Sequence, residues 1–252
     1  MDISREITKT QVDRLGDRLR KGNIGEADLR LLDLYRRSFT EAYEIVVGTI
    51  RKELALEPTG RPAKSTTSIS EKLRRESIRL TQIQDIAGCR LIVEDIANQD
   101  LVVQSLKNLF EHTTIVDRRQ QPSHGYRAVH VIAYCNGKLI EIQVRTELQH
   151  LWAELSEKLS DVVDPAIKYG GGDELVRSIL ANATSMVVSE ESIETKLASA
   201  QDQQDSFTDD GKRKIAEIQV QFVSMRRDVF KSLRETIEII EGLKGENDDL
   251  SD

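Results

Sequence analysis

Three polar residues alternate with apolar ones along GKLIEIQVRT, residues 137–146, and their types could bind a ligand. Glu141, Gln143 and Arg145 fall on one face of a predicted strand, because successive side chains of a strand point to opposite faces. A solvated strand face would show the same alternation. This strand, however, is expected to be the second arm of a hairpin, where the sheet should be partly covered. The polar face is therefore a candidate site.

Asp85 supplies the second carboxylate that a divalent metal would need. It stands just before the strand predicted at residues 88–94, where a carboxylate can reach a metal at the edge of a sheet. In phosphoryl transfer Mg²⁺ is commonly held by one or two carboxylates together with phosphate oxygens. A turn or helix-capping role for Asp85 remains the simpler alternative. His150 and the other histidines lack zinc-ligand spacing, so we expect no zinc site.

A basic segment precedes Asp85 in the chain. Residues 61–79 carry six basic and two acidic side chains, a net charge of +4 in a chain of formal net charge −7. Guanidinium groups make forked contacts with phosphate and lysines supply point charge, so the segment suits a polyphosphate. A solvated basic helix is the alternative. The six basic residues are Arg61, Lys64, Lys72, Arg74, Arg75 and Arg79.

Two further residues stand where a nucleotide base could bind. Arg90 lies inside the apolar run CRLIV, where a charged side chain needs a partner or a ligand. Tyr126 opens the strand-like run YRAVHVIAY, and a tyrosine at the mouth of a strand can stack on a base. Packing as a half-buried residue is the alternative for Tyr126.

The elements that must position these residues follow from periodicity and turn signals. Helices are predicted over residues 8–21 and along 29–54, where apolar residues beginning with Leu29 form one buried stripe. Residues 57–68 should be a loop, with Ser68 or Ser70 capping a short helix through Glu76. Strands then alternate with one helix, at residues 88–94, 100–110 (the helix), 113–118, 126–134 and 138–146.

The pair Asn136-Gly137 between two alternating runs predicts a β-hairpin. This order of elements predicts an α+β fold in which helices flank a mixed β-sheet, with helical N- and C-terminal extensions. The expected divisions are an N-terminal helical segment (1–55), a core (56–165), a C-terminal helical extension (166–245) and an acidic tail (246–252). Two long helices in the extension carry an apolar stripe, and its cover is either the core or a partner.

Composition excludes several classes of protein. With 36 basic and 43 acidic residues among 252, the chain is not expected to hold nucleic acid by bulk charge. Cys89 and Cys135 lie in strand-like runs and are predicted to be reduced. No signal peptide or membrane span is recognisable, so we expect a cytoplasmic protein without membrane contacts. P-loop, dinucleotide-binding and nucleophile-elbow motifs are missing.

Taken in order, four motifs resemble a known family. They are R-x-x-K-S-x-x-S-I-x-x-K-L from Arg61 to Leu73, IQDIAGCRLIV, HGYRAVHV and EIQVRTELQHLWAEL. Together they resemble the synthetase domain of the RelA/SpoT-type alarmone synthetases, over about residues 40–160. The resemblance implies a nucleotidyltransferase-like fold. It also implies Mg²⁺-dependent transfer of pyrophosphate from ATP to the 3′-hydroxyl of GTP or GDP, with release of AMP.

The resemblance assigns roles position by position. Asp85 and Glu141 would bind the metal and be catalytic, with Glu141 also helping to deprotonate the attacking hydroxyl. Arg90 would stack on the adenine of ATP, and Tyr126 on the base of the acceptor. The phosphates of ATP would be bound by Arg61, Lys64, Ser68 and Lys72, and the acceptor side would be supported by His130, Gln143 and Arg145.

The acceptor itself stays open at this stage. Glu157 stands where small members of the family commonly have a histidine, and a Lys or Asn just ahead of the Gly before Tyr126 is missing. Some toxin-type relatives place pyrophosphate on the 3′ end of tRNA. A third reading is a non-catalytic nucleotide-sensing or assembly module. The C-terminal helices would then serve a homo-oligomer or, for a toxin, an antitoxin partner.

Overall fold

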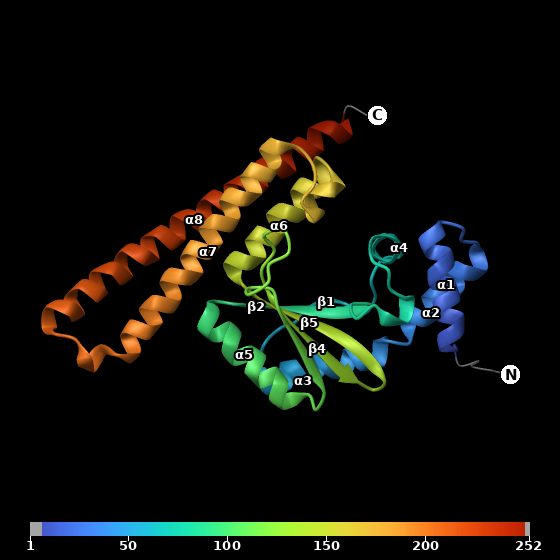
Figure 1. Ribbon diagram of the computed structural model, residues 1–252, viewed down its shortest axis with the longest axis horizontal. Coiled ribbons are helices and arrows are strands. Elements are labelled where there is room, and N and C mark those ends of the chain that lie inside the picture. The colour runs from blue at the N-terminus through green and yellow to red at the C-terminus, as the bar shows by residue number, and fades with distance from the viewer. Residues whose placement is uncertain (1–6, 250–252) are drawn as a thin grey trace. The chain divides into compact units, whose positions relative to one another are not determined.

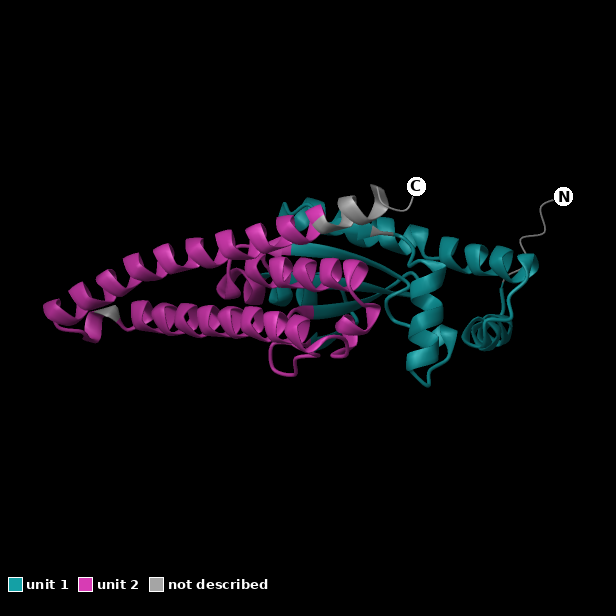
Figure 2. Cartoon of the chain, turned by 90° about the horizontal axis from the view of Figure 1, so that it is seen from above, with its two compact units in different colours: residues 1–91, 102–116, 130–144 teal, residues 92–101, 117–129, 145–252 magenta. Residues whose placement is uncertain are grey.

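The computed structural model describes the backbone of residues 7–249, and the side chains in that range except those of Arg61, Gln204 and 243–249. The chain divides into two compact units (Figure 2). Unit 1 comprises residues 1–91, 102–116 and 130–144. Unit 2 comprises residues 92–101, 117–129 and 145–252.

The sheet has five strands in the order β1-β2-β5-β4-β3. β1 pairs antiparallel with β2, with Gly60 opposite Cys89. Helices flank the sheet (Figure 1), which confirms the predicted α+β class with a mixed sheet. The strands are β1 (Thr59–Arg61), β2 (Ala87–Val93), β3 (Thr113–Asp117), β4 (Val129–Cys135) and β5 (Lys138–Thr146).

The hairpin between β4 and β5 is confirmed. Its two loop residues, Asn136 and Gly137, have φ values of 46° and 75°, the left-handed backbone that a two-residue turn of this kind requires. The tight turn fixes the register of β5. Its apolar residues Ile140, Ile142 and Val144 are fully buried on one face, so Glu141 and Gln143 occupy the other.

The N-terminal helices lie in unit 1. α1 (Lys9–Lys21) is confirmed and is capped by Thr8, whose side chain accepts from the backbone N–H of Gln11. The single stripe predicted along residues 29–54 is wrong in part. α2 (Glu26–Arg37) ends at Ser38, and α3 (Thr40–Leu54) begins at Thr40. Leu29 of α2 is 45% exposed, whereas Leu32 of α2 and Val46 and Ile50 of α3 are buried as predicted.

The segment predicted to be a loop, residues 57–68, holds two elements. β1 lies within it, and α4 (Thr66–Arg75) begins near its end. The cap of α4 is Ser65, whose side-chain oxygen accepts from the backbone N–H of Ser68 at 3.2 Å. The predicted caps, Ser68 and Ser70, are therefore wrong. Both lie inside the helix, because the extended backbone that a cap needs falls at Ser65.

Most of unit 2 is formed by the helices α6, α7 and α8, with the short 3-10 helix η2 (Pro165–Tyr169) between α6 and α7. The predicted apolar face of α6, which includes Trp152, is confirmed as core, and it packs with residues of the two long helices. α7 and α8 run side by side (Figures 1 and 2). The bounds are α6 (Glu147–Val162), α7 (Glu174–Asp202) and α8 (Asp209–Asp249), with η3 (Gln204–Ser206) between the last two.

The apolar stripe of α8 is only partly buried. Leu233, Ile237 and Ile240 join the core formed with α6 and α7, so the chain itself covers this half of the stripe. Ile218 and Met225 are 49% and 38% exposed, so the core does not cover this part of the stripe, and its cover by a partner stays a prediction. The backbone of α8 continues to Asp249, and the side chains of the predicted acidic tail lie outside the described residues.

Two general predictions concern the whole described range. Cys89 and Cys135 are both free thiols, as predicted. Within residues 7–249, no helix combines the length and the apolar character needed to cross a membrane.

Candidate active site

Asp85 of unit 1 forms two ion pairs with the predicted phosphate-binding lysines. The ammonium of Lys64 lies 2.6 Å from Oδ2 of Asp85, and that of Lys72 lies 2.9 Å from Oδ1. Lys64 lies in the segment after β1. Its own backbone N–H donates to the carbonyl of Ile86 at 2.7 Å, which brings it next to Asp85. Lys72 comes from α4. The structure thus joins three residues that are separate in the sequence.

The charge state of Asp85 follows from these contacts. Burial on its own would raise the pKa of this carboxyl. The positive charges and hydrogen bonds of Lys64 and Lys72 outweigh burial, so the pKa of Asp85 lies below its ordinary value. Asp85 is therefore a carboxylate at neutral pH, and each of its oxygens is held by a cation.

Glu141 of β5 forms a second group with two residues predicted to support the acceptor. Nδ1 of His130 lies 3.0 Å from Oε1 of Glu141, and Nε2 of Gln143 donates to Oε2 at 2.7 Å. Burial would raise the pKa of Glu141, but the hydrogen bond and charge of His130 bring it below its ordinary value. The charge of Asp85 acts in the opposite direction and raises this pKa, so the two carboxylates are electrostatically coupled.

Gly88 allows β2 to approach Glu141, a role that the sequence analysis missed. A Cβ atom at residue 88 would lie 2.7 Å from the carbonyl oxygen of Glu141 and 3.3 Å from its Cβ. A glycine inside a strand pattern is a known signal of such close approach. The next residue, Cys89, is buried, and burial together with the charge of Glu141 raises the pKa of its thiol to about 12.

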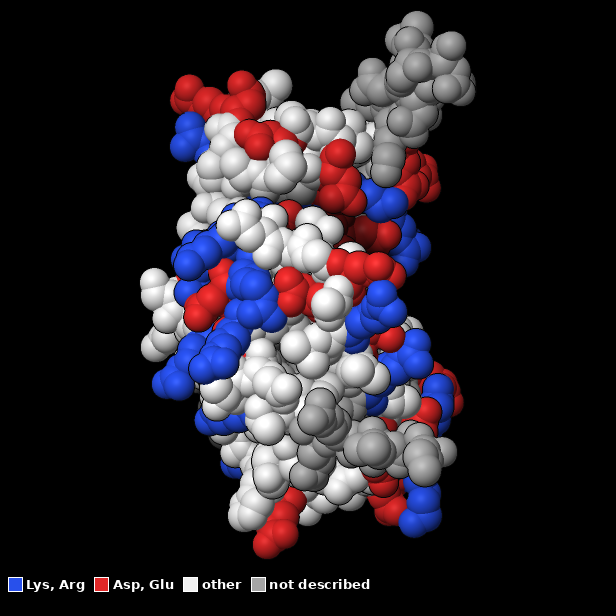
Figure 3. Space-filling view, turned by 90° about the vertical axis from the view of Figure 1, so that its right-hand side faces the viewer, with Lys and Arg blue, Asp and Glu red and all other residues white. Residues whose placement is uncertain are grey.

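Arg74, Arg75 and Arg79, three other basic residues of the segment 61–79, contact groups other than Asp85. Arg74 Nε donates to the carbonyl of Arg20 at 3.3 Å, Arg75 pairs with Glu76, and Arg79 lies 3.8 Å from Asp13. In the view of Figure 3, a group of Lys and Arg side chains lies at the left, and acidic side chains lie among and around the basic ones.

Three predicted ATP-binding residues are placed but make no described contact with Asp85. Ser68 lies on α4, with its hydroxyl 2.8 Å from that of Ser65. Arg90 lies on β2 opposite Thr59 and is half-buried. Arg61 ends β1, and its side chain lies outside the description.

In unit 2, Tyr126 and Arg145 contact each other. Nη2 of Arg145 donates to the phenolic oxygen at 3.1 Å, and the guanidinium carbon lies 5.1 Å from the ring centroid. Arg145 is 4% exposed, whereas Tyr126 is half-buried. The ring of Trp152 lies 6.4 Å from that of Tyr126, at a tilt of 53°. The arginine is thus fixed against the ring, and the tyrosine keeps part of its surface accessible.

The residues of unit 1 fit a magnesium ion. Asp85 and Glu141 offer hard oxygen donors and are near enough for their charges to interact. Mg²⁺ in nucleotide sites is usually bound by one or two carboxylates, with phosphate oxygens and water completing its shell. Within the described part of the chain, no three His, Cys, Asp or Glu side chains are arranged as a metal site. A site of two carboxylates plus substrate suits this arrangement better than a site made by protein alone.

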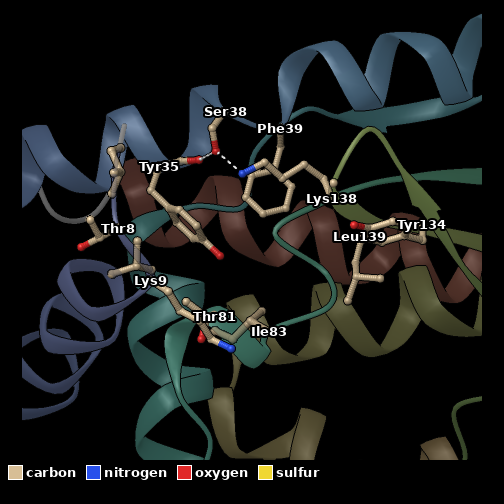
Figure 4. Close-up of a pocket in the computed structure, with 13 residues that line it drawn as sticks. Thr8, Lys9, Tyr35, Ser38, Phe39, Thr81, Ile83, Tyr134, Lys138 and Leu139 are labelled. Carbon is tan, nitrogen blue, oxygen red and sulfur yellow. Dashed lines mark hydrogen bonds between the residues drawn. The ribbon is translucent and has the colours of Figure 1, made fainter. Parts of the chain in front are cut away.

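A separate cavity of about 730 Å³ lies in unit 1 near the tip of the β4–β5 hairpin (Figure 4). None of the predicted site residues lines it. The ammonium of Lys138 lies 2.9 Å from the hydroxyl of Ser38 and 4.9 Å from the ring centroid of Phe39. These contacts attach the hairpin to the corner between α2 and α3, so we assign Lys138 a structural role.

Sequence comparison gives residues 60–160 a match to the family model described as "Region found in RelA / SpoT proteins". An uncharacterised protein of Mycobacterium tuberculosis is 39% identical over 111 residues, which are 42% of this chain and 41% of that protein. The GTP pyrophosphokinase YjbM of Bacillus subtilis is 34% identical over 116 residues, 40% of this chain and 54% of that protein. The chain therefore spans only about half the length of these relatives, or less.

Structure comparison supports the same fold. A GTP pyrophosphokinase family protein from Streptococcus pneumoniae superposes with a TM-score of 0.54 at 25% identity, covering 73% of this chain and 100% of that one. The small alarmone synthetase 1 from Bacillus subtilis gives a TM-score of 0.51 at 25% identity, covering 71% and 100%. Asp85, Glu141 and their partners all lie within the matched region, residues 60–160.

Proposed function

Because residues 60–160 form a RelA/SpoT-type region, we propose that the chain is a Mg²⁺-dependent pyrophosphokinase that transfers the β,γ-pyrophosphate of ATP to the 3′-hydroxyl of GDP or GTP. The observation that carries the proposal is the pairing of Asp85 with Lys64 and Lys72 beside a second carboxylate, Glu141. The two carboxylates are opposite in charge to Mg²⁺, and the two lysines are opposite in charge to the phosphates, so the group is complementary to a metal–polyphosphate complex. The names of the curated and structural relatives support the same reaction class.

The lysines and carboxylates divide the work of holding ATP. Lys64 and Lys72 bind its phosphate oxygens, together with Arg61 and Ser68, and Arg90 stacks on the adenine. Asp85 and Glu141 bind Mg²⁺, which when present neutralises charge on the phosphates and orients them. Both carboxyls are ionised at neutral pH, since the pKa of each is lowered. They are therefore ready to bind a cation without first losing a proton.

The reaction is an in-line displacement at the β-phosphorus of ATP. The 3′-oxygen of the acceptor forms a bond to that phosphorus, and the bond from the phosphorus to the oxygen of the α-phosphate breaks. AMP leaves with that oxygen, and the proton of the 3′-hydroxyl passes to the carboxylate of Glu141. His130 and Gln143 hold both oxygens of Glu141 and so fix its orientation. Catalysis then rests on positioning and charge stabilisation.

The acceptor base is bound by Tyr126. Arg145 lies against the phenolic ring and anchors it, so a purine can stack on the part of the ring that remains accessible. GDP and GTP are the acceptors we propose. The 3′ end of tRNA is the competing acceptor. It is less favoured because a chain of net charge −7 offers weak bulk attraction to nucleic acid.

Transfer of radiolabel tests the proposal. The chain is incubated with γ-labelled ATP and Mg²⁺ in parallel with GDP, GTP or deacylated tRNA, and products are separated by chromatography. We expect label on GDP or GTP and none on tRNA, with no transfer in a matched reaction containing EDTA. Label on tRNA alone would show that tRNA, and neither GDP nor GTP, is the acceptor. Absence of label on every acceptor would contradict the enzymatic function and favour a binding module.

A further inference from the structure

The loop that carries Tyr126 is closed at its base and bends sharply at its tip. The backbone N–H of Arg118 donates to the carbonyl of Ala128 at 2.9 Å, which joins the two ends of the loop. Ser123 and Tyr126 exchange backbone hydrogen bonds, so Tyr126 follows directly on a tight turn. These bonds lie within the loop itself. Side chains of the loop also contact other elements, among them α7.

Arg127 links the loop to α7. Its Nε and Nη2 lie 2.9 Å and 2.5 Å from Oε2 of Glu191, and its Nη1 donates to the carbonyl of Arg119 at 2.8 Å. Glu191 is buried in α7, outside the region matched by the family model. A buried charge pair with several hydrogen bonds is intolerant of losing one partner. Because Arg127 is the next residue after Tyr126, this pair restrains the backbone that carries the tyrosine.

Glu191 also connects to the start of α6, next to Arg145. Its Oε1 accepts from Nε2 of Gln149 at 2.7 Å. Gln149 is buried, and its Oε1 accepts from the backbone N–H of Thr146 at 3.1 Å, which caps α6. Thr146 follows Arg145 in the chain. One carboxylate of α7 therefore bonds directly to Arg127, the neighbour of Tyr126, and through Gln149 to Thr146, the neighbour of Arg145.

A second contact with α7 lies on the other side of Tyr126. Gly125 has a φ of +87°, and a Cβ atom there would lie 2.4 Å from Oγ1 of Thr184 and 2.8 Å from the ring of Trp152. Nε1 of Trp152 donates to the same Oγ1 at 2.9 Å. The loop thus lies directly against Thr184 at residue 125, where only a glycine fits.

We propose that α7 positions the acceptor-binding tyrosine through Glu191 and Thr184. These two residues are seven positions apart, and so lie on one face of the helix. They hold the loop at residues 125 and 127, immediately before and after Tyr126. Both are positioning residues: they touch neither ATP nor the acceptor, and act through Arg127 and Trp152. The part of this inference that concerns the acceptor rests on the proposed function.

Two measurements on the full chain test this inference. Hydrogen exchange of the peptide covering residues 117–129 reports whether the loop is held, and it needs no nucleotide. Steady-state kinetics report KM for the acceptor and for ATP separately. For Glu191→Gln we expect exchange at 117–129 to become at least fivefold faster. We also expect KM for the acceptor to rise at least tenfold, with KM for ATP changed less than twofold.

Controls separate positioning from general destabilisation. Glu174→Gln makes the same chemical change at an exposed site of α7 and should match wild type in both measurements. Thr184→Val replaces the hydroxyl by a methyl group of similar size and should also raise the acceptor KM, which keeps the test available if Glu191→Gln folds poorly. The double variant Arg127→Met with Glu191→Gln should show the same exchange rate and acceptor KM as Arg127→Met alone, because each substitution breaks the same Arg127–Glu191 pair.

The outcomes for the two proposals are distinct. Unchanged exchange of residues 117–129 in both Glu191→Gln and Thr184→Val overturns the positioning role. Equal rises in the KM of ATP and of the acceptor also overturn it. A wild-type chain that transfers nothing to any acceptor overturns the proposed function, and the exchange measurement then still decides whether α7 holds the loop.

Discussion

Lys64 and Asp85 form an ion pair in which the ammonium lies 2.6 Å from Oδ2, while Lys72 holds Oδ1 of the same carboxylate at 2.9 Å. In the proposed reaction, Asp85 would hold the metal ion, and Lys64 and Lys72 would bind the phosphates of ATP. The carboxylate of Asp85 would then still face a positive charge, which a buried carboxylate needs.

Replacing Lys72 should therefore change how activity depends on pH. Metal binding needs Asp85 ionised, and the two lysines lower the pKa of Asp85 against the effect of burial. In Lys72→Gln one of the two cations is lost, so the pKa of Asp85 rises. The acid limb of the profile of kcat/KM against pH should move up by roughly one unit. KM for ATP should rise roughly tenfold, because a charged contact with phosphate is lost.

Arg74→Gln is the matched control for Lys72. Arg74 is on the same helix, but it is exposed and donates to the carbonyl of Arg20. Its replacement should leave the acid limb unmoved. An identical acid limb in Lys72→Gln and wild type would mean that Lys72 does not govern the ionisation of Asp85 in the working enzyme.

Neutralising either proposed metal-binding acid should stop transfer. Asp85→Asn and Glu141→Gln each keep the size of the side chain and remove one negative charge from the metal site. We expect the rate of pyrophosphate transfer to fall on the order of 10³-fold or more in each. Asp33→Asn removes an acid whose side chain is 50% exposed and pairs with Arg37 of its own helix at 2.9 Å, and it should retain full activity. Normal activity in either site variant would show that the metal ligands are wrongly assigned.

Gly88 should be intolerant of a methyl group. The added Cβ would lie 2.7 Å from the carbonyl oxygen of Glu141, so one of two paired strands would have to move. We expect Gly88→Ala to lower the free energy of unfolding by about 1–3 kcal/mol, measured by urea denaturation, and to reduce transfer. Gly48→Ala is the control, because this helical glycine has open space around its Cβ position. It should be neutral or stabilising by roughly 0.5–1 kcal/mol. Equal effects of the two substitutions would contradict the close approach of β2 to β5.

Glu190 should make the stability of the protein depend on pH near neutrality. Its side chain is 3% exposed, with Nε of Arg226 at 3.3 Å. Burial raises the pKa of Glu190 from 4.5 to about 7, since the charge of Arg226 offsets it only in part and nearby Glu194, Glu191 and Asp95 add to it. The folded protein thus keeps this proton over a range of pH in which the unfolded chain has lost it.

The sign of the effect follows from that difference. Below about pH 4.5 the carboxyl is protonated in both the folded and the unfolded state, so its ionisation does not change the free energy of unfolding. Between about pH 4.5 and 7 the free energy of unfolding falls, by roughly 3 kcal/mol at most. Glu190→Gln removes this dependence. Its melting temperature should exceed that of wild type at pH 8 by more than at pH 5, and an equal difference at both pH values would contradict the raised pKa.

Local sequence patterns were sufficient to predict much of the sheet and the strand face on which Glu141 and Gln143 lie. The Asn136-Gly137 turn fixed the register of the hairpin, and the alternation along β5 placed Glu141 and Gln143 on one face. Both signals involve residues adjacent in the chain, so no tertiary information was needed. The resemblance assigned Asp85 to a metal and the two lysines to the phosphates of ATP, but the ion pairs between them were not predicted and could not follow from spacing.

Other features depend on contacts that no local pattern records. The same apolar periodicity is compatible with one long helix or with a break at Ser38, and it did not reveal that Leu29 is exposed. Several serines near α4 were acceptable caps, and the backbone at Ser65 decided between them. Glu191 is 64 residues from Arg127, in a helix whose sequence indicates only amphipathic packing. The pairing of Glu191 with Arg127 can be recognised only in the folded structure.

The nucleotide released from ATP tests the central claim most directly. Wild-type protein is incubated with ATP, Mg²⁺ and an excess of GDP, and AMP, ADP and modified acceptor are quantified by ion-exchange chromatography. Attack at the β-phosphorus predicts one AMP for each acceptor modified and no ADP. Formation of ADP in proportion to product would show that a single phosphoryl group is transferred instead, and would contradict the proposed pyrophosphokinase.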